Sequence, residues 1–335
     1  MRRVVLVRLI SIYFPYLLTT CDSSLIIETR YHTGMLARFP VTLSRSPNDT
    51  TPAYATLDLA RFRSSLFTSQ TFTATGWFEP SRILLGGRPL ENPTTIEIEY
   101  DIESPVCDWD EFFVTAVIAG TQNENFSDLV NDFLMVPTTN TTGVIITNVS
   151  QHHIATYVLA GEMFYTQSLH ATFWVVPVTI RIATPAEEAA EVIIDPVEYS
   201  ECVIHTIDKY TFVPRELLDD IIVEMGFLGI QFQMLRDYDG ISRVQLIDVN
   251  ETQIAQLPTL EYIVHAENGG FIHVAELTPL DYTEKVNEQT REMLIRSTFG
   301  PSCTLTPLVL RQVAVHYDRA NARIGFGEPL ADIIY

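Results

Sequence analysis

A histidine lies in the middle of a stretch that otherwise has the composition of a β-strand running into a proline. Residues 201–214 are ECVIHTIDKYTFVP, with His205 and Thr206 at the centre and Asp208 shortly after. An imidazole at this place can serve as a catalytic or metal-binding group, or it can be a neutral residue in an ordinary strand. Asp208 could supply a carboxylate. The chemistry of the stretch therefore depends on what the rest of the chain places beside it.

Metal ligands and paired thiols do not occur at recognisable spacings. His152 and His153 are adjacent, but the other histidines are scattered, and two imidazoles lack the further ligands that a zinc site needs. None of the four cysteines has the C-x-x-C spacing typical of a zinc or redox site. There is no glycine-rich phosphate loop either. The sequence predicts neither a metal site nor a bound cofactor.

The chain is acidic and rich in apolar residues. It has 335 residues, 47% of them hydrophobic, which favours two domains with substantial cores. The 42 acidic and 21 basic residues give a formal net charge of −21. Because most of such a surface would repel a polyanion, we do not expect nucleic acid as a partner.

Residues 1–21 have the organisation of a secretory signal peptide. Three arginines precede the apolar run LISIYFPYLL, and small polar residues follow it, which predicts cleavage near Cys21. The alternatives are a membrane anchor and a lipid-modified Cys21. Ten apolar residues are fewer than the roughly 20 that a spanning helix needs, and Thr20 is bulky for the position before a lipidated cysteine. No later stretch is long enough to span a membrane, so we expect a secreted or extracellular protein.

Glycosylation motifs and cysteines agree with a secretory route. Five asparagines lie in the N-x-S/T acceptor motif, namely Asn48, Asn125, Asn140, Asn148 and Asn250. After removal of the signal, Cys107, Cys202 and Cys303 remain. Since three is an odd number, at most one internal disulfide forms and one thiol is left over.

The fold class indicated by the local patterns is all-β, mainly strands with a few short helices. Short segments rich in β-branched and aromatic residues are separated by Gly, Pro, Asn or Asp; they are TTIEIEY, FFVTAVIAG, GVIITNV, FWVVPVTIRI, AEVIIDPV, RVQLIDV and AVHYD. One helix is predicted over residues 214–226, beginning at a proline and ending at a glycine. A second helix is predicted over residues 283–296. The least apolar segment near the middle of the chain, residues 160–170, is where we divide it.

The last forty residues carry a family resemblance. LTPLVLRQVAVHYDRANARIGFG, residues 305–327, resembles the C-terminal signature of pepsin-like aspartic peptidases, in which F-L-R and an aromatic strand ending in F-D lead into R-A-N-x-R-I-G-F. Upstream, residues 257–282 resemble that family's strand, Gly-Gly turn and strand. The weaker resemblance of IEIEYDIES places Tyr100 at the position of the flap tyrosine. Together these segments cover most of residues 50–330.

The resemblance implies a bilobal fold with a cleft between two β-barrel-like lobes. It implies an N-terminal lobe over residues 22–165 and a C-terminal lobe over residues 166–335, related by an internal duplication. It also implies that Cys202 and Cys303 lie just before two neighbouring strands and form the disulfide. A monomer is expected.

In the same comparison with the family, His205 occupies the position of the second catalytic aspartate. The family's D-T-G-T-S strand has a proline nine residues after the Asp, and Pro214 has this spacing from His205. Thr206 is retained, Ile207 replaces the glycine, and Asp208 occupies the next Thr position. A β-branched residue resists the close backbone approach that the glycine permits. The resemblance places Tyr100, Thr206 and Asp208 as binding residues of the cleft.

The first catalytic aspartate has two alternative positions. Aligning Leu66 and Phe67 with the family's hydrophobic pair after D-T-G-S puts Ala60 there, whereas aligning Asp58 keeps a carboxylate but requires inserted residues. Neither alignment restores D-T-G. We therefore expect a catalytically inactive protein that binds a peptide or protein in its cleft or on its surface, with an active aspartic-type endopeptidase of altered dyad as the alternative.

Overall fold

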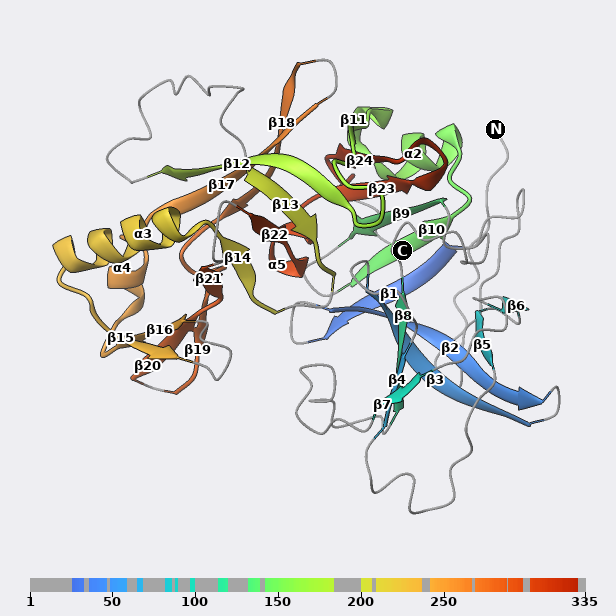
Figure 1. Cartoon of the computed structure of the whole chain (residues 1–335), viewed down its shortest axis with the longest axis horizontal. Helices are drawn as coiled ribbons and strands as arrows, with labels where there is room; N and C mark the ends of the chain where they lie inside the picture. Colours follow the sequence, from blue (N-terminus) through green and yellow to red (C-terminus); the bar gives the residue numbers. More distant parts are fainter. Residues whose placement is uncertain are drawn as a thin grey trace.

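The structure of the chain is a computed structural model (Figure 1). It describes residues 132–138, 142–183, 200–206, 209–236, 242–266, 269–287, 289–297 and 302–330, together with the strand backbone of eight segments between residues 26 and 119. Strands predominate in these residues and the helices are few and short. The prediction of a mainly β protein is confirmed.

The largest sheet joins strands from both ends of the chain. Its order is β11-β24-β23-β9-β10-β1-β2-β3-β8-β4-β7, with β5 beside β2 and β6 beside β5. The strands are β1 (Ile26–His32), β2 (Leu36–Ser46), β3 (Asp49–Asp58), β4 (Ser65–Thr68), β5 (Arg82–Leu85), β6 (Arg88–Pro89), β7 (Glu97–Glu99), β8 (Val114–Ala119), β9 (Asp132–Pro137), β10 (Thr142–Thr147), β11 (Phe164–Gln167), β23 (Ala314–Asp318) and β24 (Arg323–Gly327).

Three smaller sheets follow in the second half of the chain. The five-stranded sheet has the order β18-β17-β12-β13-β22, a pair joins β14 to β21, and a four-stranded sheet has the order β15-β16-β20-β19 (Figure 1). The strands are β12 (Val175–Ala183), β13 (Ser200–Ile204), β14 (Thr211–Val213), β15 (Gln231–Arg236), β16 (Ser242–Ile247), β17 (Thr259–His265), β18 (Phe271–Leu277), β19 (Thr283–Lys285), β20 (Thr290–Met293), β21 (Ile295–Ser297) and β22 (Cys303–Leu305).

The helices lie beside these sheets. They are α2 (Gln151–Tyr157), α3 (Arg215–Phe227), α4 (Glu251–Ile254) and α5 (Pro307–Leu310), with single 3₁₀ turns η2 (Leu159–Gly161) and η3 (Arg319–Asn321). The helix predicted over residues 214–226 is α3, which begins after Pro214 and buries Leu218, Ile221 and Met225. That prediction is confirmed.

The helix predicted over residues 283–296 is wrong, because the segment forms β19, β20 and the start of β21. The chain turns where the N–H groups of Val286 and Asn287 donate to the carbonyl of Thr290. β20 then pairs with both β19 and β16. Pairing with β16, more than forty residues earlier in the chain, overrides the local helical pattern.

Two hydrophobic clusters lie on opposite faces of β9 and β10. Leu134 and Ile146 pack with residues of α2 in the smaller cluster. Phe133 and Ile145 point the other way and join the larger cluster, which contains the buried residues of β12, β13, β17, α3 and α5. Since successive side chains of a strand point to opposite faces, these two strands are buried on both sides.

The predicted division of the chain between residues 165 and 166 falls inside β11. β11 pairs along its length with β24, near the C-terminal end of the chain. β12, the next strand, belongs to the five-stranded sheet. Within the described residues, the change from one sheet to the other therefore comes between β11 and β12.

One arrangement of parallel strands occurs twice. β3 pairs in parallel with β8, and the next strand, β4, pairs in parallel with β7. In the second half, β13 pairs in parallel with β22, and the next strand, β14, pairs in parallel with β21. The interval from Asp58 to Ser65, between β3 and β4, equals that from Ile204 to Thr211, between β13 and β14. Parallel pairing requires a long connection, so the recurrence is not a product of local hairpins.

The D-R-A-N-A-R segment forms the tight turn between β23 and β24. Asp318 accepts hydrogen bonds from Asn321 Nδ2 and Arg323 Nε, both 2.7 Å from Oδ2. Burial alone would raise the pKa of Asp318, but the bonds from Asn321 and Arg323 outweigh it and hold that pKa below its ordinary value. Ala322 closes the turn in the left-handed region, with φ 51°.

We expect Ala322→Gly to raise the free energy of unfolding by about 0.5–1 kcal/mol, because glycine adopts positive φ without the steric cost that alanine bears. The matched control is Ala155→Gly, which makes the same chemical change at an exposed position inside α2 and should lower stability by about 1 kcal/mol. Urea denaturation of the two variants measures both signs. A loss of stability in both variants would contradict the assignment of the left-handed turn.

Candidate functional site

The candidate site lies where β13 and β22 end side by side. The strands are parallel, and Ile204 pairs with Leu305. The N–H of His205 donates to the carbonyl oxygen of Leu305 at 2.9 Å. This bond holds the backbone of His205 beside Thr306, the first residue after β22. The end of this strand pair therefore brings an imidazole and a threonine hydroxyl to one edge of the sheet.

A disulfide joins the same two strands. Cys202 and Cys303 are direct partners in the register of β13 and β22, and their Cα atoms are 4.3 Å apart. The pair is the one that the family resemblance implies. Closing a loop of about 100 residues stabilises the folded chain by about 4–5 kcal/mol in the chain-entropy model. Cys107, the remaining cysteine of the predicted mature chain, lies outside the described residues.

Two buried polar atoms at this site lack a hydrogen-bond partner within the described part of the chain. They are Nδ1 of His205 and Oγ1 of Thr306. Thr306 is 0% exposed, and it caps α5 without using its side chain. An unpaired buried polar atom costs about 1–3 kcal/mol. The two unpaired atoms at the ends of β13 and β22 therefore lower the stability of the folded chain.

The neighbouring strand is held by fully paired threonines. Thr211 Oγ1 of β14 donates to the carbonyl of Thr304 at 2.8 Å, and the N–H of Phe212 donates to Thr304 Oγ1 at 2.8 Å. These bonds fasten β14 to β22 at Thr304, two residues before Thr306. The hydroxyl of Thr306 is equally buried but has no such bond within the described residues.

The described side chains at these ends offer an imidazole and hydroxyls for binding. His205 is half-buried, and Thr206 and Thr306 are buried. Such groups donate and accept hydrogen bonds to a polar ligand. None of the three is a carboxylate, so they cannot share a proton in the way that paired carboxylates do.

The structure leaves most of the other predicted site residues outside its description. Asp58 is the last residue of β3, where its backbone pairs with Ala119 of β8. Ala60, Tyr100 and Asp208 lie outside the described residues. The structure therefore places His205 and Thr206 together but gives no side-chain geometry for a partner from the first half.

The repeated strand arrangement limits which residue in the first half of the chain can correspond to His205. His205 follows the last residue of β13, and the residue that follows the last residue of β3 is Leu59. Strand ends vary by one or two residues between otherwise equivalent elements. The equivalent position is thus Leu59 or a residue one or two positions away from it, an interval that contains both Asp58 and Ala60.

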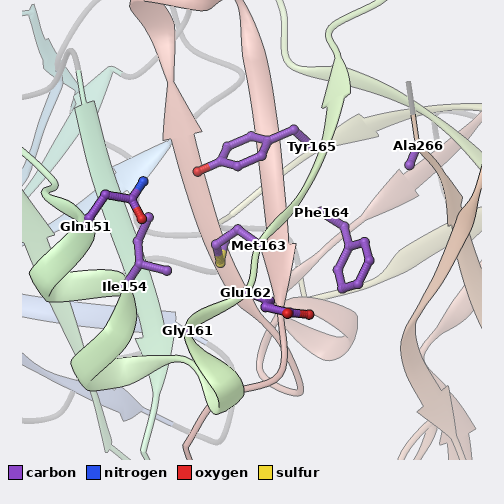
Figure 2. A pocket seen from close by; sticks show the side chains of 8 residues that line it. All are labelled: Gln151, Ile154, Gly161, Glu162, Met163, Phe164, Tyr165 and Ala266. Atoms are coloured by element: carbon purple, nitrogen blue, oxygen red, sulfur yellow. The ribbon is translucent and has the colours of Figure 1, made fainter. Parts of the chain in front are cut away.

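A cavity of about 520 Å³ lies apart from the strand ends, beside β11. It is lined by Gln151, Ile154, Gly161, Glu162, Met163, Phe164, Tyr165 and Ala266. Figure 2 shows that Glu162 and Phe164 extend to one side of the chain, and Met163 and Tyr165 to the other. Sequence reasoning missed this cavity, because its residues come from α2, β11 and the end of β17 and form no motif of local spacing.

Two of the five predicted glycosylation sites fall in the described residues. Asn250 is exposed, and its Oδ1 accepts from the N–H of Gln253 at the start of α4. The capping bond uses Oδ1 only, so it does not involve Nδ2, the atom to which a glycan is attached. Asn148 is half-buried with φ 51°. Asn48, Asn125 and Asn140 lie outside the described residues.

No helix in the described part of the chain is long and apolar enough to cross a membrane. No group of three or more His, Cys, Asp or Glu side chains there is arranged to hold a metal ion. His152 and His153, the adjacent pair in the sequence, lie in α2, and His153 belongs to the capping box of that helix.

Comparison with known proteins assigns this chain to no family. No family model matches the chain, and no curated protein matches it either. The functional argument therefore depends on the residues and their geometry.

We expect Thr306→Val to leave stability unchanged or to raise it by up to about 1 kcal/mol, because it replaces an unpaired buried hydroxyl by a methyl group. Thr211→Val is the matched control: Thr211 is equally buried, but its hydroxyl is bonded to Thr304, so its loss should cost about 1–2 kcal/mol. Thermal melting of the two variants compares them. A cost for Thr306→Val as large as that for Thr211→Val would mean that the Thr306 hydroxyl has a partner.

Proposed function

We propose that this chain is a secreted, pepsin-like protein of the aspartic peptidase family that binds a peptide or protein in its cleft or on its surface without hydrolysing it. The observation that carries the proposal is His205, which stands directly after the parallel strand β13 at the position where the family resemblance expects the second catalytic aspartate.

The chemistry of the family explains why this replacement is decisive. Two carboxylates about 3 Å apart cannot both ionise, so they share a proton and act together as base toward water and acid toward the peptide carbonyl. A histidine opposite an aspartate forms an ion pair in acid and supplies no shared carboxyl proton. Losing a general base costs about 10²–10⁴ in rate. Since the two groups act as a unit, losing one of them removes nearly all of their joint contribution.

The recurrence of the strand arrangement supports a bilobal fold. β3 with β8 and β4 with β7 in the first half correspond to β13 with β22 and β14 with β21 in the second. An internal duplication of one lobe would generate this correspondence. In a bilobal fold, the ends of β3 and β13 would face each other across the cleft.

The C-terminal signature supports membership of the family. Its Asp318, Asn321 and Arg323 are joined by hydrogen bonds in one turn, and Leu308, Val309 and Leu310 of the L-V-L-R segment are buried in α5. The matching residues thus have structural roles: they form the turn between β23 and β24, and they bury α5 in the larger hydrophobic cluster.

The proposal includes a secretory route and no cofactor. The signal peptide of residues 1–21, the five acceptor asparagines and the Cys202–Cys303 disulfide all agree with passage through an oxidising compartment. We propose a monomer with a peptide or protein ligand, and no nucleic acid partner, because the net charge is −21.

An active aspartic-type endopeptidase with an altered dyad is the second candidate. Asp58 favours it, since this carboxylate ends β3 and lies inside the short interval that contains the position equivalent to His205. In this candidate Asp58 is the base and His205 its partner. This candidate requires peptide hydrolysis that is lost when Asp58 is replaced.

We expect no hydrolysis of a peptide library between pH 2 and 7 by the purified, glycosylated protein, because the shared-proton pair is absent. Mass spectrometry of the digest measures it, with Asp58→Ala as the matched variant and pepsin as the positive control. His205→Asp combined with Ile207→Gly should also remain inactive, since the first half still lacks D-T-G. Cleavage by the unmodified protein that Asp58→Ala abolishes would instead establish the endopeptidase.

A further inference from the structure

A tyrosine, a histidine and an aspartate form a continuous hydrogen-bonded chain across the large sheet. His316 Nε2 lies 2.6 Å from Asp132 Oδ1, and His316 Nδ1 lies 2.8 Å from the hydroxyl of Tyr165. His316 is buried, whereas Asp132 and Tyr165 are half-buried. The three residues come from β23, β9 and β11, so tertiary structure alone brings them together.

A glycine makes the contact between β11 and β23 possible. Gly325 of β24 is the cross-strand partner of both Tyr165 and His316. A Cβ atom at this position would lie 2.7 Å from Tyr165 Cε1, closer than van der Waals contact allows. With glycine there, the tyrosine ring crosses over β24 and its hydroxyl meets the imidazole.

The hydrogen-bond chain has one consistent arrangement of protons when the imidazole is neutral. An ionised Asp132 can only accept, so His316 Nε2 carries the ring proton. His316 Nδ1 then accepts from the hydroxyl of Tyr165. In this arrangement His316 is positioned to remove the phenolic proton, as the base does in a nucleophile–base–orienter triad.

The surroundings of Tyr165 keep its hydroxyl protonated until a base acts. Burial raises the pKa of Tyr165 above its ordinary value and outweighs the opposing effect of Arg323, while Asp318 and Asp132 raise it further. The Arg323 guanidinium lies 4.1 Å from the centroid of the tyrosine ring and is paired with Asp318. Free phenolate is therefore scarce, and reactivity depends on His316.

Tyr165 also borders a cavity whose lining is partly polar and partly apolar. It borders the cavity of about 520 Å³ together with Ile154, Met163 and Phe164. Figure 2 shows Tyr165 and Met163 on the side of the chain that faces α2. The cavity is large enough for a single aromatic ring, and its apolar side chains favour such a group.

We propose that Tyr165 is a nucleophile that accepts acyl or sulfonyl groups from small activated aryl compounds bound in this cavity. The Tyr165 oxygen forms a bond to the carbonyl carbon or sulfur of the reagent, and the bond to the leaving group breaks. The phenolic proton passes to His316 Nδ1, while Asp132 holds the proton on Nε2. With a sulfonyl fluoride the products are the Tyr165 sulfonate ester, fluoride and the protonated imidazole.

Tyr210 provides an internal control in the same chain. It is also half-buried, the Arg296 guanidinium lies 3.4 Å from its ring centroid, and burial raises its pKa. Its hydroxyl, however, donates to Glu292 Oε1 at 3.1 Å. A carboxylate is a much weaker base than imidazole near neutral pH, and Tyr210 does not line the cavity, so Tyr210 should react more slowly than Tyr165.

The test is site-resolved mass spectrometry of the full protein after timed exposure to benzenesulfonyl fluoride at pH 7.5. We expect Tyr165 to be labelled at least about tenfold faster than Tyr210, and His316→Gln to reduce the Tyr165 rate about a hundredfold. His273→Gln, which alters an exposed histidine of β18, should leave the rate unchanged. Circular dichroism and melting establish that each variant is folded.

Asp132→Asn keeps the test decisive if His316→Gln does not fold, and it should slow labelling about tenfold. Labelling of Tyr165 no faster than that of Tyr210, or labelling unchanged in the folded variants, would overturn the proposal.

Discussion

The parallel pairing of β13 with β22 is the constraint on which the second half of the chain depends. It brings residues a hundred positions apart into register, and the Cys202–Cys303 disulfide fixes that register covalently. The five-stranded sheet builds outward from β13, and the larger hydrophobic cluster packs around the two strands. Because parallel strands end at the same edge, this pairing also fixes where His205 and Thr306 lie.

The strands and their disulfide form a framework, and the proposed site lies at one edge of it. The strands, the disulfide and the Asp318 turn form a well-bonded scaffold, whereas His205 and Thr306 carry polar atoms without partners in the described residues. Stability is usually sacrificed where a site binds or reacts. The unpaired atoms are therefore suited to contact with a ligand, even though the carboxylate expected from the family resemblance is missing.

Local patterns in the sequence predicted the elements that depend on local interactions. Helix α3 and strand β23 follow from periodicity, residue composition and proline and glycine positions. The hairpin of β17 and β18 was expected from the family resemblance of residues 257–282. Residues 283–296 were mispredicted, because pairing with β16 decides their structure. The Asp132, His316 and Tyr165 cluster could not be predicted, since its members lie up to 184 residues apart and meet only through the order of strands in the sheet.

The central claim, a pepsin-like cleft without its carboxylate pair, is tested most directly by the affinity for two matched peptides. One contains a statine residue, and the other lacks only the statine hydroxyl, which in an active enzyme replaces the attacked water between the carboxylates. Such transition-state mimicry contributes about 10²-fold or more to binding. We predict dissociation constants that differ by no more than about threefold in calorimetric titration at pH 4. Hundredfold tighter binding of the hydroxyl-bearing peptide would contradict the account.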